Sequence, residues 1–355
     1  MSMIQISKRQ KGTSKLVDVL IRIGAIVLSL IFIGIVLAIM GYDPFQVYGK
    51  IIQTPFKRFK DVMNKTIMLT TLSLGIAIAF RMKFWNIGAE GQFYMGAFGA
   101  ASMAFMCPDL PPILLLPLMA IAGFVCGGLW ALIPAVIKAK FGASETLVTL
   151  MMNYVAIAFI SYLQYGPWKD PAALGAAKVP NFSENAVLPD VFGIHAGWII
   201  TLVLVIIMTI LLKYTKLGYQ IDVIGESETT AKYAGMNTVK IMIIAVLISG
   251  GLCGMAGFMQ ASAVERSITD SMSAGLGFTA VITAWLAKLK PPVIVVASFM
   301  FSILLQSGSS LQVMKIPSSI TEIMQGVIIF FVLACEFFIN YKISLRKHNT
   351  AKEAE

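Results

Sequence analysis

The sequence predicts an all-α membrane protein that crosses the bilayer many times, and three observations lead to this fold class. Of the 355 residues, 57% are hydrophobic and only 13% are charged, whereas a soluble domain carries roughly 25% charged residues. Apolar runs of about 20 residues, long enough to cross a bilayer as a helix, recur along the whole chain. The charged residues gather in the short connectors between these runs, which is typical of a polytopic membrane protein.

The apolar runs give the expected spans in order. They cover residues 21–40, 66–80, 87–107, 113–137, 146–164, 197–213, 240–262, 276–287, 291–310 and 321–341. The run 276–287 is too short to cross a bilayer of about 30 Å at about 1.5 Å per residue unless it is extended or re-entrant. We therefore expect about eight to ten transmembrane helices in a single transmembrane domain over residues 1–355.

The distribution of Lys and Arg predicts the orientation. Residues Lys8, Arg9, Lys11 and Lys15 place the N-terminus in the cytoplasm because cytoplasmic connectors are rich in positive charge. Ten spans then put the C-terminus on the same side, so both termini are expected to be cytoplasmic in a plasma-membrane protein. The remaining inside connectors hold Arg81, Lys83, Lys138, Lys140, Lys213, Lys216, Lys232, Lys240, Lys288 and Lys290.

Two outside connectors differ from the rest. The segment 41–65 is rich in Lys and Arg, against the rule for outside connectors, and we expect an amphipathic helix on the outer surface there. The segment of about 166–196 is the longest outside loop. It contains Pro167, Pro171, Pro180 and Pro189 and is expected to be irregular.

The residue types of metal sites and catalytic triads are scarce. His195 and His348 are the only histidines, and the four cysteines have no paired spacing, so a His-based metal site, a triad or a disulfide framework is not expected. The net charge of +10 sits in the connectors, so we expect no nucleic acid as a partner. No G-x-x-x-x-G-K-[ST] phosphate loop is present, so this chain should not hydrolyse ATP.

The stretch GESETTAKYAG, residues 225–235, is a polar island in the inside connector of about 214–240. Ser227 is suited to begin a short helix as its N-cap, and Gly235 is suited to end it. Ala231 and Ala234 would give this helix a small-residue face, with Tyr233 as an exposed aromatic. Such a rigid helix is what a soluble partner needs to move a membrane domain; the alternative is an ordinary solvated loop.

This stretch resembles the cytoplasmic coupling segment of ABC transporter permeases of the simple-sugar, nucleoside and branched-chain amino acid class, which has the form G-x-N-x-x-A-A-x-Y-A-G-I. Glu226, Ser227 and Thr230 depart from that form. The resemblance implies that the segment contacts an ATPase subunit. The residues expected to do so are Gly225, Glu226, Glu228, Ala231, Tyr233, Ala234 and Gly235.

Three further segments resemble the nucleoside branch of the same class. FRMKFWNIGAEGQFYMGA (80–97) is similar to its N-I-G-x-E-G-Q segment, ETLVTLMMNYVA (145–156) to a helix ending L-N-Y, and GLGFTAVITAWLAKLKPP (275–292) to G-x-G-F-x-A-I-A-V-A-L. The G-G-I-D-L-S motif of the ribose-type branch is absent. The chain departs from the class at Ala287–Lys290, where small glycines are usual.

The resemblance implies a permease subunit of an ATP-binding cassette importer, with no cofactor of its own. Its partners would be an ATPase subunit carrying ATP and Mg²⁺, a second homologous permease, an extracellular substrate-binding lipoprotein and a nucleoside substrate. Simple sugars or other small polar solutes are the alternative substrates. An ion-coupled secondary transporter is a different class, but it usually needs intramembrane carboxylates, and the spans offer essentially Glu90. A membrane enzyme would need clustered His, Cys or paired acids.

Polar and aromatic residues within the expected spans are candidates for the substrate pathway, because an ionisable group in a span usually faces a cavity or the protein interior. The candidates are Asn86, Glu90, Gln92, Asn153, Phe278 and Trp285. Asn86 and Glu90 are four residues apart, and we expect them to lie on one helical face. The alternatives are that Glu90 pairs with Arg81 or Lys83 and orients helices, and that the aromatics are packing or interface residues.

Overall fold

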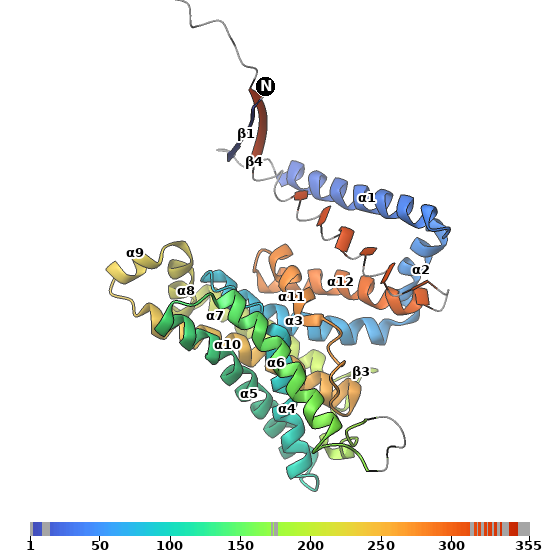
Figure 1. The fold of residues 1–355 in the computed structure, drawn as a ribbon, viewed down its shortest axis with the longest axis vertical. Helices are drawn as coiled ribbons and strands as arrows, with labels where there is room; N and C mark the ends of the chain where they lie inside the picture. The colour runs from blue at the N-terminus through green and yellow to red at the C-terminus, as the bar shows by residue number, and fades with distance from the viewer. Residues whose placement is uncertain are drawn as a thin grey trace, which may run out of the picture. The chain divides into compact units, whose positions relative to one another are not determined.

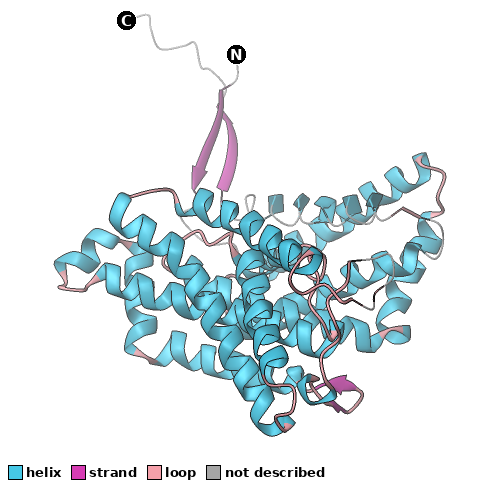
Figure 2. Ribbon diagram, turned by 60° about the horizontal axis from the view of Figure 1, so that its bottom comes forward, coloured by secondary structure: helices cyan, strands magenta, loops and turns pink. Residues whose placement is uncertain are grey.

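The computed structural model describes residues 3–8, 15–171, 173, 177–312, 316–317, 319–320, 323–324, 326–328, 330–331, 334–335 and 341–346. The described chain is helical apart from four short strands (Figure 2), which confirms the all-α fold class. It forms two compact units, one from Met1–Lys57 with Leu304–Glu355 and the other from Arg58–Ile303.

The first unit contains β1 (Met3–Lys8), α1 (Lys15–Ile39), α2 (Pro44–Lys57), the end of α12 (Pro291–Gln312) and β4 (Tyr341–Arg346). The second unit begins with α3 (Phe59–Arg81), α4 (Ala89–Met106), α5 (Pro112–Phe141), α6 (Glu145–Tyr165), η1 (Glu184–Ala186), β2 (Asp190–Val191) and β3 (Ile194–His195). It continues with α7 (Gly197–Tyr214), α8 (Lys216–Glu226), α9 (Glu228–Tyr233), α10 (Thr238–Met259), the π-helical η2 (Gln260–Glu265), α11 (Leu276–Leu286) and the start of α12 (Figure 1).

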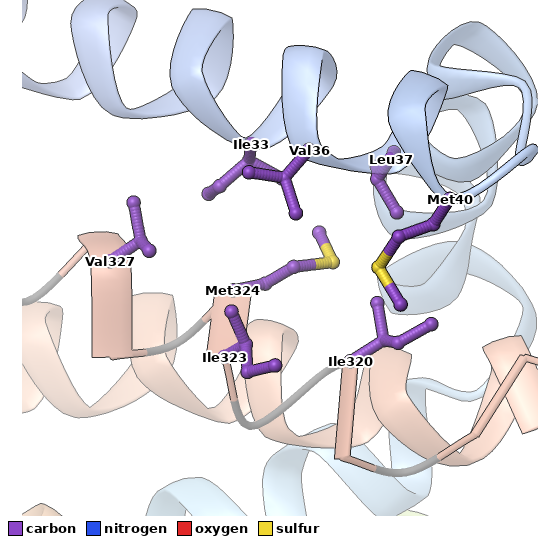
Figure 3. Close-up of a pocket in the computed structure, with 8 residues that line it drawn as sticks. All are labelled: Ile33, Val36, Leu37, Met40, Ile320, Ile323, Met324 and Val327. Atoms are coloured by element: carbon purple, nitrogen blue, oxygen red, sulfur yellow. The ribbon is translucent and has the colours of Figure 1, made fainter.

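An apolar contact between α1 and the C-terminal segment holds the first unit together. Side chains of Ile33, Val36, Leu37 and Met40 on α1 face Ile320, Ile323, Met324 and Val327 (Figure 3). Val47 of α2 joins the same buried cluster. The strands β1 and β4 pair antiparallel, with Met3 opposite Arg346.

Helices α1 and α2 of this unit match the segments expected from the sequence. The expected span 21–40 lies in α1, with Met40 just beyond its end, and the expected amphipathic helix within 41–65 is present as α2. The side of the membrane on which α2 lies stays a prediction. The expected span 321–341 falls largely outside the described residues.

Six helices among the described residues are long and apolar enough to cross a membrane. They begin at Phe59, Pro112, Glu145, Gly197, Thr238 and Pro291, and they confirm the spans expected at 66–80, 113–137, 146–164, 197–213, 240–262 and 291–310. In the most apolar part of α3, 83% of the residues are buried, and in α10 67%, against 28% in each of α5, α6 and α7. Helices α3 and α10 therefore form the centre of the second unit, and α5, α6 and α7 present apolar surface to lipid.

Glycines allow α4, α5 and α10 to pack with their backbones in contact. A Cβ atom on Gly96 would overlap the backbone of Gly254, and one on Gly254 would overlap the carbonyl of Gly123. In lipid, such close approach supplies the dispersion contacts that hydrophobicity cannot supply. The small-residue runs of the sequence thus mark the helix contacts at the core of this unit.

Two non-helical segments enter the second unit between its helices. Residues 82–88 precede α4, and residues 266–275 precede α11. Ser73 Oγ donates to the Ala280 carbonyl at 3.1 Å, and Ser73 lies about 12 Å along the axis from the end of α3. Helix α11 therefore spans only part of the membrane depth, as expected for the short run 276–287.

Three helices end at one side of this unit with the same cap. Met236 N–H donates to Ala231 O after α9, Phe84 N–H to Ala79 O after α3, and Leu289 N–H to Ala284 O after α11, which is the long hydrogen bond of the Schellman motif. The left-handed position is Gly235 after α9 but Lys83 after α3 and Lys288 after α11. A non-glycine residue in that conformation costs about 1–2 kcal/mol.

The opposite side of the unit carries the long loop 166–196. Its described residues are irregular, as expected, apart from η1 and the β2–β3 pair, in which Asp190 lies opposite His195. The His195 ring is buried, and its Nδ1 accepts the Gly197 N–H at 3.2 Å. Burial lowers the pKa of His195 to about 4, so the ring is neutral at pH 7 and closes the loop over the start of α7.

Candidate functional site

The polar island 225–235 forms the end of α8 and the helix α9. Ser227 Oγ accepts the Thr230 N–H at 3.2 Å, which confirms Ser227 as the N-cap. Gly235 has a φ of +75°, and its N–H donates to Lys232 O at 3.0 Å, which confirms it as the residue that ends the helix. Helices α8 and α9 lie together at one end of the second unit (Figure 1).

Helix α8 is fixed directly to the end of α3. A Cβ atom on Gly225 would overlap the carbonyl oxygen of Arg81, so only glycine allows this approach. The Arg81 guanidinium forms an ion pair with Asp222 at 3.2 Å, and Lys83 Nζ donates to the Glu226 carbonyl at 3.4 Å. The segment is therefore anchored rather than a freely solvated loop.

The side chains of α9 divide into inward and outward sets. Ala231 is fully buried, whereas Ala234 is exposed, so the two alanines do not share an accessible face. The Tyr233 side chain is 91% exposed. Glu226 and Glu228 are also exposed, and Glu228 pairs with Lys232 at 2.8 Å. A large aromatic side chain held out on a capped helix is a strong candidate for an interface anchor.

A groove of about 540 Å³ adjoins α9. Residues of the 82–84 segment, the α5–α6 connector, α8, α9 and α10 line it, and Lys138 pairs with Glu145 across its floor at 2.7 Å. Neither the Lys138–Glu145 pair nor the Arg81–Asp222 pair was expected from the sequence. The only signal was that their connectors were expected on the same side of the membrane.

The second candidate site lies where α4 and α11 begin. Glu90 is 3% exposed, and its Oε2 accepts the Gly277 N–H at 2.7 Å. The carboxylate therefore lies between the first turns of two helices, where the helix dipoles favour negative charge. Its expected alternative partners, Arg81 and Lys83, bind Asp222 and the Glu226 carbonyl instead.

Asn86 does not share a helix face with Glu90, so that expectation was wrong. Helix α4 begins only at Ala89, and Asn86 lies in the non-helical segment before it. Asn86 Nδ2 donates to Gln92 Oε1 at 3.0 Å and to Ser249 Oγ at 3.2 Å. Its Oδ1 accepts from Gln92 Nε2 at 2.9 Å and from the Gly88 N–H at 3.1 Å. The two amides thus satisfy each other and join the segment to α10.

Asn153 of α6 also binds the backbone around the start of α4. Its Oδ1 accepts the Gly91 N–H at 2.8 Å, and its Nδ2 donates to the Ile87 carbonyl at 2.9 Å. The structure therefore brings Asn86, Glu90, Gln92 and Asn153 into one buried region. Their hydrogen-bonding groups are engaged by the chain itself, so these residues position α4, α6, α10 and α11.

The aromatic candidates are accessible. Phe278 and Trp285, seven residues apart on one face of α11, are 39% and 45% exposed. Trp285 stacks on Trp85 with ring centroids 5.5 Å apart and planes within 6°, and Phe80 packs edge-on against Trp85 at 5.3 Å. The sequence marked Phe278 and Trp285 as pathway candidates but did not predict the Trp85–Trp285 pair.

Comparison with known families gives one match over most of the chain. The family described as the permease component of branched-chain amino acid transport systems matches residues 59–333. This range includes the whole second unit except its first residue, together with part of the C-terminal segment.

Curated relatives cover nearly the full length. The chain is 28% identical over 332 residues to the glucose ABC transporter permease protein TsgB13 of Haloferax volcanii, covering 88% of this chain and 86% of the relative. It is 27% identical to the nucleoside ABC transporter permease protein NupB of Lactococcus lactis subsp. cremoris, covering 95% and 96%. It is 28% identical to the guanosine ABC transporter permease protein NupP of Bacillus subtilis, covering 90% and 94%.

Substitution of Glu90 separates a positioning role from a ligand role. Glu90→Ala leaves the buried Gly277 N–H without an acceptor, so we expect a loss of about 1–3 kcal/mol in stability, measured as a fall in Tm in detergent. Glu90→Gln keeps an acceptor oxygen and should lose less. The exposed Glu228→Ala is the control, with a change within about 0.5 kcal/mol. A Glu90→Gln protein with unchanged Tm and no solute uptake would identify Glu90 as a ligand instead.

Proposed function

The chain belongs to the family of permease components of branched-chain amino acid transport systems, and from this premise we propose that it carries nucleosides through an ATP-driven importer. As a member of this family it is a multi-pass membrane subunit of an ABC importer, working with an ATPase subunit, and not itself an enzyme. The proposal adds the substrate, the contacts with the ATPase and the further partners.

Two observations support nucleosides as the substrate. Relatives named for nucleoside and guanosine transport align with at least 90% of both chains. The accessible face of α11 carries Phe278 and Trp285, and aromatic rings stack well on the flat face of a base. A sugar is the second candidate because the glucose permease relative is equally similar, at 28% identity.

The proposal that ATP drives import rests on the exposure of Tyr233. Its side chain is 91% exposed on a helix that is capped at both ends. We assign this side chain, with Ala234, Glu226 and Glu228, to the contact with the ATPase, which holds ATP and Mg²⁺. Gly225, Ala231 and Gly235 fix the shape of the segment. Closure of the ATPase would favour one of two conformations of the membrane subunit because it binds that conformation better.

The basic connectors indicate on which side of the membrane this segment lies. Arg81 and Lys83 contact α8, Lys138 lines the groove beside α9, and Lys288 precedes the Leu289 carbonyl that Arg81 binds. An excess of positive charge marks the cytoplasmic side. We therefore propose that α9 faces the cytoplasm. Independently, the basic residues before the first expected span and the even number of expected spans lead us to propose that both chain termini are cytoplasmic. A second homologous permease would complete the pathway along the exposed face of α11.

The opposite end of the second unit offers a surface for the extracellular binding protein. A groove of about 630 Å³ is lined by apolar residues of α5 and by Lys60, Glu184, Asp190 and Arg266. Lys60 pairs with Asp190 at 2.6 Å. Arg266 is exposed at the end of η2 with a φ of +53°. We propose that Arg266 binds a carboxylate of the binding protein.

The substrate is tested on the assembled complex in proteoliposomes. We expect unlabelled nucleosides to abolish uptake of a radiolabelled nucleoside at concentrations where glucose and branched-chain amino acids do not compete. Collapse of proton and sodium gradients with ATP present should leave uptake unchanged, since the energy comes from ATP. Competition by glucose alone would indicate a sugar as the substrate. Loss of uptake when the ion gradients are collapsed would indicate an ion-coupled transporter.

The contact with the ATPase is tested by Tyr233→Ala. Removal of an exposed anchor residue typically costs about 2 kcal/mol of binding, so we expect uptake and substrate-stimulated ATP hydrolysis to fall at least tenfold. The control is Tyr165→Ala, which removes a 65% exposed tyrosine at the opposite end of the second unit. Equal activity of the two variants would contradict the assignment of α9.

The external groove is tested by Arg266→Glu. Charge reversal should raise the concentration of binding protein that gives half-maximal uptake by about tenfold, with little change in maximal uptake. The control is Lys169→Glu, an exposed lysine of the loop 166–196 that does not line the groove. An unchanged half-maximal concentration in Arg266→Glu would remove this groove from the docking surface.

A further inference from the structure

One arginine joins three parts of the second unit. Arg81 is the last residue of α3. Its Nη1 contacts Asp222 of α8 at 3.2 and 3.3 Å from the two carboxylate oxygens. Its Nε donates to the Leu289 carbonyl, just beyond α11, at 3.3 Å. A single planar group thus bridges the coupling helices and the end of α11.

The turn held by Arg81 is conformationally unusual. Lys288 and Leu289 have φ values of +52° and +55°, a region that favours glycine. This is the place where the sequence departs from the small glycines usual in the class. The backbone keeps a glycine-like conformation without glycine, so contacts from outside the turn must help to hold it.

Backbone hydrogen bonds join this turn to the end of α11, which precedes it in the chain. The Lys288 N–H donates to the Trp285 carbonyl at 2.8 Å, and the Leu289 N–H donates to the Ala284 carbonyl at 3.0 Å. A displacement of the Leu289 carbonyl therefore displaces the last turn of α11, which carries Trp285. Phe80, next to Arg81, packs edge-on against Trp285, with 6.2 Å between the ring centroids.

We propose that Arg81 is a positioning residue that transmits movement of α8 and α9 to α11. When the ATPase displaces α9, Asp222 moves with α8. The guanidinium then pulls on the Leu289 carbonyl, and the exposed face with Phe278 and Trp285 shifts. The inference rests on the proposed contact between α9 and the ATPase and names the route from that contact to the pathway.

The chemistry of the guanidinium explains why arginine suits this position. Its N–H groups project in a fixed planar fork, so Nη1 and Nε bind two acceptors that lie in different directions. A lysine ammonium can pair with Asp222, but it is a compact charge without that fork. Arg81→Lys should therefore keep the ion pair and weaken the link to Leu289.

The experiment uses the whole complex in proteoliposomes and measures nucleoside transported per ATP hydrolysed. We expect this ratio to fall about tenfold in Arg81→Gln and to an intermediate value in Arg81→Lys, with the basal ATPase rate and the assembly of the complex retained. Arg58→Gln is the matched control, because Arg58 pairs with Asp61 at the opposite end of α3; its ratio should stay within twofold of the wild type.

A second measurement follows α11 itself. Phe278→Cys, made in a background lacking the four native cysteines, places a thiol on the exposed face of α11. Its rate of maleimide labelling should change at least threefold when ATP and vanadate are added. The addition of Arg81→Gln should abolish that change. A purely structural role of Arg81 would alter the labelling rate equally with and without nucleotide.

The outcomes separate this inference from the proposed function. If Tyr233→Ala abolishes stimulation of the ATPase while Arg81→Gln keeps both the transport ratio and the nucleotide-dependent labelling, the transmission route is wrong and the ATPase contact stands. If Tyr233→Ala has no effect, the ATPase contact itself is wrong, and the inference falls with it. If Arg81→Gln fails to assemble, the labelling of Phe278→Cys with Arg81→Lys decides: unchanged nucleotide dependence overturns the proposal.

Discussion

The non-helical backbone from Asn86 to Gly88 lies largely buried inside the second unit, so its polar groups must find their hydrogen-bond partners within the protein. Asn86 and Asn153 supply them. Asn86 binds the Gly88 N–H and links through Gln92 and Ser249 to α4 and α10, and Asn153 binds Ile87 and Gly91 from α6. Because these amides fix where α4 begins, they also fix Glu90, and Glu90 in turn fixes the start of α11. The arrangement of the second unit follows from this one requirement.

Helix α11 is consequently held by polar contacts at its two ends. Glu90 accepts the Gly277 N–H at its buried end, and Arg81 holds the Leu289 carbonyl beyond its other end. Its buried side packs on α3, where Ser73 reaches the Ala280 carbonyl. Its opposite side, with Phe278 and Trp285, is exposed. Because α11 is short and held at both ends, we expect it to move as one body with the elements that hold it.

The sequence predicted those features that depend on neighbouring residues. Apolar runs marked the spans because their length and composition suffice, and Ser227 and Gly235 marked the ends of α9 because capping is local. The face shared by Asn86 and Glu90 was wrong because the helix starts at Ala89, three residues after Asn86, and tertiary hydrogen bonds decide that start. The Arg81–Asp222 pair joins residues 141 positions apart, and no local pattern contains it. The sequence showed that Lys288 stands where the class usually has a small glycine, but it did not show that the Lys288 backbone is left-handed.

The distribution of polar groups bears on how a solute is recognised. The amides and carboxylate near the start of α4 are engaged with the chain itself, and the Thr279 and Thr283 hydroxyls donate to carbonyls within the α11 region. Under the proposed function, the exposed face of α11 would therefore offer a solute mainly stacking and dispersion contacts through Phe278 and Trp285. Stacking and dispersion contacts are modest in energy and do not require one particular flat ring. They would let a flat solute enter and leave without a deep free-energy minimum. Under the proposed function, discrimination among solutes would then belong to the binding protein, because tight polar recognition at this face would slow release of the solute.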